Sequence, residues 1–244
     1  MGLNITFRDA GHGIVMVGTG TLNAQEIIAA KRALLGEPDR VRMLTHGIFS
    51  FTEVTSFNAS FEEIRELAGV DEQLALLIPD AIVAVVAPRD HEFGTARMWE
   101  ALSVGTGWET YVFRAPEPAE EWIRSTLATR ETVAAAGRQV ERMLQTRLAE
   151  MQEEVREYPV PIAGCDAQFN FLLEQRAAVA AEIARLRMVM GKETAPSERP
   201  AKLDAFLASC AFLQRGDVEY AWSAPAADTA GEPLTRMSGG THTA

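Results

Sequence analysis

The chain has few of the residues on which metal sites, disulfide frameworks and nucleic-acid surfaces depend. Its two cysteines, Cys165 and Cys210, are too few for a disulfide framework or a structural zinc site. It has 23 Lys and Arg against 34 Asp and Glu, a net charge of −11, whereas phosphate binding needs clustered cations, so we expect no nucleic-acid partner. The four histidines show no metal-ligand spacing, and we expect neither a metal nor a cofactor: His12, His46, His91 and His242.

Long apolar runs and targeting segments are also lacking. No run approaches the length that spans a bilayer, and the start has no charged segment followed by an apolar one, so we expect a cytoplasmic protein. Residues 1–6 fit the spacing of an N-myristoylation signal. Ile5 and Phe7, however, alternate with polar residues as a first strand would, and we favour the strand.

Residues 80–114 carry the clearest fold signal that is present. The apolar run at 81–87 is rich in β-branched residues, lies between Pro79 and Pro88, and does not alternate with polar residues. This pattern predicts a strand buried on both faces. A helix at 93–102 and a second apolar run at 111–113 follow, which together predict a strand–helix–strand unit of an α/β fold.

Further helix and strand signals alternate through the first half. Asn23 with Glu26, and Ser60 with Glu63, have the spacing of capping boxes and predict two helix starts. Another helix should begin near residues 116–118. The remaining strands, of which the first two form a hairpin, are expected at 5–8, 14–18 and 41–51.

From residue 131 onward the sequence has the period of long amphipathic helices. A first apolar stripe is Val133, Val140, Leu144, Leu148, Met151 and Val155. A second stripe follows a Pro-containing loop and a cap at Asp166 and comprises Phe169, Leu172, Arg176, Val179, Ile183, Leu186 and Met190. Two such helices joined by a short loop should pack as an antiparallel hairpin.

The chain therefore divides into four parts. We expect an α/β domain at 1–128, a long helical hairpin at 129–190, a linker and short helix at 191–222, and a disordered tail at 223–244. The short helix should cover 200–213 and stop at Gly216. The residues leave open whether the helix near 116 continues into the one at 131.

Four segments of the first domain have a distinctive combination of residues. They are AVVAP at 84–88, FGTARMW at 93–99, GWETYVFR at 107–114 and PAEEW at 118–122. In these segments the stretch from about 3 to 127 resembles the SpoIIAA-like, or STAS-like, family of small bacterial domains. The resemblance implies a mixed sheet with helices largely on one face and no enzymatic activity. It also implies a regulatory protein-binding module or a relative of the CRAL-TRIO lipid-binding domains.

The same resemblance raises the question of a phosphorylation switch. Phospho-regulated relatives carry an Asp at the end of the central strand and a Ser at the start of the following helix. Here residues 44–47 read LTHG, without the acid, which does not favour a switch. Ser56 and Ser60 lie near the corresponding place and are the phospho-acceptor candidates.

Arg97, Trp99 and His91 are the candidate ligand-binding residues. We expect Arg97 in the first turns of a helix, where the dipole and free N–H groups favour an anion. With His91 nearby it could hold a phosphate or a lipid headgroup. The alternative, which we favour, is an Arg97 that pairs with a neighbouring carboxylate while its stem packs beside Trp99.

Two other patterns have a structural explanation that we favour. Cys165 precedes a helix start, a setting that activates thiols, but no histidine is committed to it and Asp166 opposes a thiolate. Residues 18–23, GTGTLN, lie between a strand and a helix but lack the Lys-Ser/Thr of a phosphate loop. We interpret the first as a small buried thiol and the second as a tight turn.

Two functional hypotheses follow. The first is a non-enzymatic regulatory or scaffold protein, in which the STAS-like domain binds a protein partner and the hairpin dimerises or docks. The second is a small-ligand or lipid-binding module with an anion site near Arg97. A thiol enzyme based on Cys165 is a third, and the hairpin stripe could also pack only within its own chain.

Overall fold

The computed structural model describes residues 2–159 and 167–223. The chain divides into two compact units. The first comprises Met1–Arg130 with Lys192–Ala201, and the second comprises Glu131–Gly191 with Lys202–Ala244. Each unit has its own apolar core, and helix α5 (Pro116–Glu157) contributes to both.

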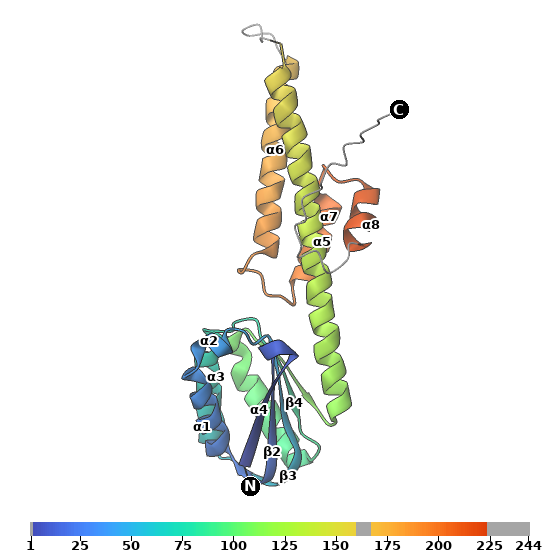
Figure 1. The fold of residues 1–244 in the computed structure, drawn as a ribbon. Coiled ribbons are helices and arrows are strands. Elements are labelled where there is room, and N and C mark those ends of the chain that lie inside the picture. The colour runs from blue at the N-terminus through green and yellow to red at the C-terminus, as the bar shows by residue number, and fades with distance from the viewer. Residues whose placement is uncertain (1, 160–166, 224–244) are drawn as a thin grey trace, which may run out of the picture. The chain divides into compact units, whose positions relative to one another are not determined.

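The first unit is built on a mixed sheet with the strand order β1-β2-β3-β4-β5, which confirms the α/β fold class (Figure 1). The first two strands form the expected antiparallel hairpin, and the next three add in parallel. The strands are β1 (Gly2–Arg8), β2 (Gly13–Asn23), β3 (His46–Asn58), β4 (Ile82–Val86) and β5 (Glu109–Phe113).

Both predicted capping boxes are present. Asn23 Oδ1 accepts from the Glu26 N–H at 3.0 Å, and Ser60 Oγ accepts from the Glu63 N–H at 3.2 Å. The returning bond from the Ser60 N–H lowers the pKa of Glu63 below its ordinary value. The connecting helices are α1 (Ala24–Leu35), α2 (Pro38–Val41), α3 (Phe61–Ala75) and α4 (Asp90–Leu102), with 3₁₀ turns η1 (Asp9–Gly11) and η2 (Ser103–Thr106).

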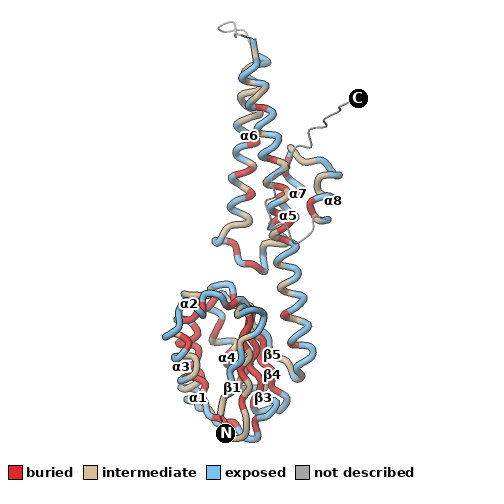
Figure 2. The backbone as a smooth tube through the Cα atoms, viewed as in Figure 1, coloured by how far each residue is buried: buried red, intermediate tan, exposed pale blue. Residues whose placement is uncertain are grey.

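Strand β4 is buried on both faces, as its unbroken apolar run predicts. Val85 belongs to a core that the sheet shares with α1, α3 and α4. Ile82, Ala84 and Val86 belong to a second core, which α5 completes with Ala119 and Ile123. Figure 2 shows the buried residues concentrated in the strands and on the helix faces that meet them.

The second unit contains the helical hairpin. Helix α6 (Ala167–Met190) runs antiparallel to α5. Near the end of α6 Arg187 pairs with Glu141 of α5, and near its start the ring of Phe169 lies 5.2 Å from that of Tyr158, which follows α5. Two short helices, α7 (Arg199–Ser209) and α8 (Arg215–Ser223), pack on this pair. The core includes Val133, Val140, Leu144, Met151, Val179, Ile183, Leu186, Leu203, Phe206 and Ala221.

Several expected boundaries are wrong. Strand β3 begins at His46, because the short helix α2, with Pro38 at its first position, runs to Val41 and a turn follows it. Helix α4 begins at Asp90. Gly216 lies inside α8, which the sequence did not reveal, and α7 already ends at Ser209. The helix that begins at Pro116 continues without a break through residue 131 to Glu157, which answers the question that the sequence left open. The expected cap at Asp166 and nearly all of the expected tail lie outside the described residues.

Gly107 provides a test of the turn before β5. Its φ is +75°, and a Cβ there would lie 3.1 Å from the Pro79 carbonyl oxygen, so Gly107→Ala should destabilise the first unit by about 1–2 kcal/mol. Gly69, inside α3 with open space around it, is the matched control, and Gly69→Ala should stabilise by up to ~1 kcal/mol. Urea unfolding followed by tryptophan fluorescence in a Trp222→Phe background reports on this unit, and equal effects of both substitutions would contradict the prediction.

Candidate functional site

Arg97 does not occupy a helix N-terminus. Because α4 begins at Asp90, Arg97 lies about two turns into the helix, so the expectation of a dipole-assisted anion site there is wrong. Its exposed guanidinium pairs with Glu100, which is the carboxylate pairing that the sequence favoured, whereas the expected packing of its stem beside Trp99 stays a prediction. Burial raises the pKa of Glu100 above its ordinary value, and the charge of Arg97 opposes that shift.

Trp99 and His91 do not converge with Arg97. Trp99 lies on the buried face of α4, and its indole N–H donates to Asp71 Oδ2 at 2.7 Å. His91 Nε2 lies 3.1 Å from the Phe57 carbonyl oxygen. Residues two apart on a helix point to different sides, so Arg97 and Trp99 do not line one pocket.

The other candidates are dispersed. Ser56 is an exposed residue of β3 that pairs with Thr21, and Ser60 is the N-cap of α3, where its hydroxyl also donates to Glu63. Their interpretation as phospho-acceptors stays a prediction. Cys165 lies outside the described residues, whereas Cys210 is buried in the helical core.

The most unusual group in the first unit is a buried ion pair that sequence reasoning missed. The Lys31 ammonium donates to both carboxylate oxygens of Asp71, at 2.6 and 2.8 Å. Asp71 is fully buried, the Lys31 side chain is 12% exposed, and the ammonium lies 5.3 Å from the Trp99 ring centre. The carboxylate thus accepts from an ammonium on α1 and from an indole on α4, and these contacts join three helices beneath the sheet.

Helical spacing explains why these charges lie inside. Lys31 follows Ile27 by four residues and precedes Leu34 by three, so it falls on the buried stripe of α1. Asp71 has the same relation to Leu67 and Leu74 on α3. The inward position of each charge on its helix was therefore visible in the sequence, whereas the residue that each charge would meet was not.

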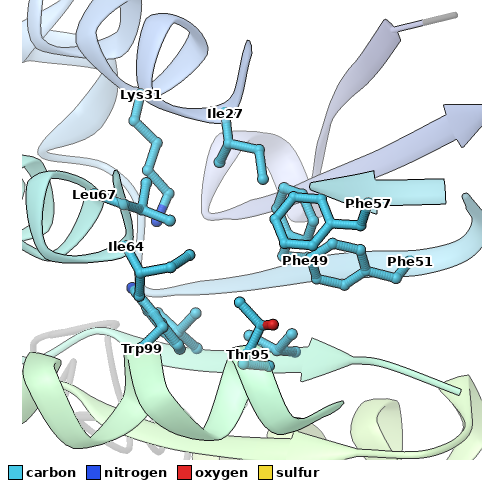
Figure 3. A pocket seen from close by; sticks show the side chains of 12 residues that line it. Ile27, Lys31, Phe49, Phe51, Phe57, Ile64, Leu67, Thr95 and Trp99 are labelled. Carbon is cyan, nitrogen blue, oxygen red and sulfur yellow. The ribbon is translucent and has the colours of Figure 1, made fainter. Parts of the chain in front are cut away.

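Two apolar cavities adjoin the ion pair. The smaller, of about 40 Å³, has the rings of Phe49, Phe51 and Phe57 on one side and Lys31 with Trp99 on the other (Figure 3). The larger, of about 70 Å³, also contacts Lys31 and reaches His46, Asp71 and Trp108. Lys31, Phe49 and Val83 line both spaces, so the lysine side chain lies where the two cavities adjoin.

A buried ion pair of this kind is a poor source of stability. Removing two charges from water costs several kcal/mol for each, and their mutual attraction with good hydrogen bonds roughly offsets that cost. What the pair supplies is a fixed polar group inside an apolar layer. Such a group can orient a small molecule but does not by itself activate a bond.

Comparisons with models of known protein families, with curated proteins and with solved structures find no match for this chain. Among residues 2–159 and 167–223, no three His, Cys, Asp or Glu side chains are grouped so that they could hold a metal ion. Within the same ranges no helix combines the length and the apolar character needed to cross a membrane.

The ion pair predicts a non-additive effect on stability. Lys31→Met leaves a charged carboxylate buried and should cost about 3–5 kcal/mol. Adding Asp71→Asn removes that charge while an oxygen remains for the Trp99 indole, so the double variant should be more stable than Lys31→Met by roughly 1–3 kcal/mol. Urea unfolding in the Trp222→Phe background measures both variants.

An ion pair on α3 that is exposed on both sides is the control for this experiment. Arg65→Met breaks the pair with Glu62 at the surface and should change stability by less than about 1 kcal/mol. The interpretation of Lys31 and Asp71 as a coupled buried pair fails if Lys31→Met costs no more than Arg65→Met, or if the second substitution at Asp71 lowers stability further.

Cys210 should be unreactive in the folded protein. It is 5% exposed, and burial raises the pKa of its thiol above its ordinary value, which disfavours the reactive thiolate. In a Cys165→Ser variant, iodoacetamide at about pH 7.5 should react with the Cys210 thiol far more slowly than it reacts with the thiol of free glutathione. Unfolding in about 8 M urea should remove this difference in rate. Fast labelling without urea would show that the helical core around Cys210 is open.

Proposed function

We propose that the chain is a non-enzymatic regulatory or scaffold protein. Its α/β unit would present a surface to a protein partner, and its helical unit would join a second copy of the chain. The observation that carries this proposal is at the end of the α5–α6 pair, where the two helices extend past α7 and α8 (Figure 1) and Phe171 is exposed.

The geometry of this end differs from that of the rest of the hairpin. Helices α7 and α8 contribute Leu203, Phe206 and Ala221 to the core of the hairpin. Among the described residues, α5 and α6 extend beyond these two helices (Figure 1), where the rings of Tyr158 and Phe169 contact each other across the pair and Phe171 is 56% exposed. Figure 2 shows this end largely in the colours of exposed and intermediate residues. Exposed aromatic side chains of this kind are common anchors of protein interfaces.

A second copy is the occupant that the helical geometry favours. Two helices alone bury one stripe each, whereas four helices enclose a full core. Two hairpin ends packed about a two-fold axis would supply the missing pair, with the same residues contributed from each side. Leu172 and Val155, which are half buried here, would then be covered as well.

The STAS-like assignment of the first unit remains part of the proposal, as does a cytoplasmic location. The STAS-like assignment is supported by the element order, in which a hairpin leads into parallel strands with α1, α3 and α4 on one sheet face. The segment 93–99 lies within α4, the segment 107–114 contains β5, and the segment 118–122 lies in the first turns of α5. This order of helix, strand and helix supports the proposed assignment.

Light scattering coupled to size-exclusion chromatography tests the helical part of the proposal. At micromolar concentration the mass measured for the full chain should be twice the 26.7 kDa of a single chain. Phe171→Ser should shift it to the monomer mass by removing an apolar anchor. Met188→Ser, at the other end of α6 and 75% exposed, is the matched control and should leave the dimer intact.

The outcomes separate clearly. A monomer at all concentrations up to about 100 μM, where even weak dimers form, would refute self-association through the hairpin. A dimer that both variants disrupt equally, or that neither disrupts, would place the interface elsewhere.

A further inference from the structure

We propose that the interior of the α/β unit is a binding site for a small, uncharged, mostly apolar molecule with one hydrogen-bond acceptor. The site consists of the two cavities on either side of Lys31, between the sheet and helices α1, α3 and α4. Binding there is independent of how the helical unit associates.

The hydrogen-bonding capacity of Lys31 points to an acceptor on the ligand. An ammonium has three N–H donors, and here two of them go to the oxygens of Asp71. Across the described ranges the structure gives this ammonium no other acceptor, and its side chain lines both cavities. A carbonyl or hydroxyl oxygen that enters the cavity can therefore take the third donor.

The charge balance points to an uncharged ligand. The positive charge of Lys31 and the negative charge of Asp71 compensate each other, and the Trp99 indole completes the partners of the carboxylate. His46, at the far end of the larger cavity, has both ring nitrogens occupied, by Asp9 at 2.9 Å and by Thr45 at 3.0 Å. A carboxylate or an ammonium on the ligand would be a net buried charge among apolar side chains, which is strongly unfavourable.

The size and polarity of the cavities restrict the ligand further. Each exceeds the volume of roughly 10–15 Å³ that a water molecule needs, but a stable buried water also needs two to four polar partners. The aromatic and aliphatic walls around the Phe49 side of the site do not supply them. Since a cavity of about 150 Å³ accommodates benzene with its six heavy atoms, the adjoining spaces of about 40 and 70 Å³ accommodate a molecule of about four or five heavy atoms only when it occupies both, and they exclude a long acyl chain.

Tryptophan indole signals make the two cavities separately observable. Trp99 lines the smaller cavity and Trp108 the larger, where the Trp108 indole N–H donates to the Ile78 carbonyl oxygen at 2.8 Å. The other two tryptophans, Trp122 and Trp222, line neither cavity and serve as internal controls. In ¹H–¹⁵N spectra of the full chain, the indole signals of Trp99 and Trp108 thus report binding in the cavities, and those of Trp122 and Trp222 report nonspecific effects of the added molecule.

The experiment titrates the full chain with three molecules of nearly equal shape. They are 2-butanone, propionate and sec-butylammonium, which are respectively a neutral acceptor, an anion and a cation. We expect 2-butanone to shift the indole signal of Trp99, Trp108 or both, saturably and with a millimolar Kd. Propionate and sec-butylammonium at the same concentrations should leave both signals in place, and Trp122 and Trp222 should not respond to any of the three.

Two cavity-filling variants localise the binding. Ala96 lines the smaller cavity and Ala81 the larger, and each is buried. Ala96→Val and Ala81→Val should weaken the response of Trp99 and Trp108, respectively, by about tenfold or more in Kd. The dispersion of the remaining signals shows whether each variant is folded, and either variant alone suffices for the test.

Three results would overturn the proposal. The first is the absence of a saturable shift at 2-butanone concentrations up to about 50 mM. The second is binding of propionate or sec-butylammonium as tight as that of 2-butanone, which would show that charge balance does not govern the site. The third is a 2-butanone response that both folded filling variants leave unchanged.

Discussion

The structure depends on the burial of strand β4 on both faces. An unbroken apolar strand cannot be left with one face in water, so the sheet needs a helical layer on each side. Helices α1, α3 and α4 cover one face, and the start of α5 covers the other through Ala119 and Ile123. Because α5 does not end there but continues to Glu157, the helix that completes the sheet also begins the helical unit.

The Lys31–Asp71 pair shows what a core gives up for a polar group. Apolar side chains of similar size would hold α1 and α3 together at least as well, since desolvation offsets most of the attraction between buried charges. The pair and the Trp99 indole instead impose a fixed hydrogen-bond geometry on three helices. The same polar group gives the two neighbouring cavities a chemical preference, which a purely apolar void would not have.

Prediction from the sequence succeeded at the two capping boxes, whose signal is local, but the tight turn expected at residues 18–23 is wrong, because these residues belong to β2. The boxes at Asn23 and Ser60 bring together residues three apart, and the turn that forms them needs no distant partner. It failed at β3, because residues 41–45 are apolar enough for a strand yet follow Pro38, which starts a short helix. The ligand site near Arg97 failed for a related reason: an α-helix turns about 100° per residue, so closeness in sequence to Trp99 did not mean a shared face.

The sequence by itself determined the layered α/β class, the capped starts of α1 and α3, and the apolar stripes of the long helices, because each is a matter of periodicity or of contacts within one turn. Only the tertiary structure decided that Lys31 meets Asp71 and that α7 and α8 cover one part of the hairpin and not its far end. Forty residues separate the two charges, and such a contact depends on how whole helices lie on the sheet. Helix packing of that kind is set by the summed shape of many side chains, which no short segment encodes.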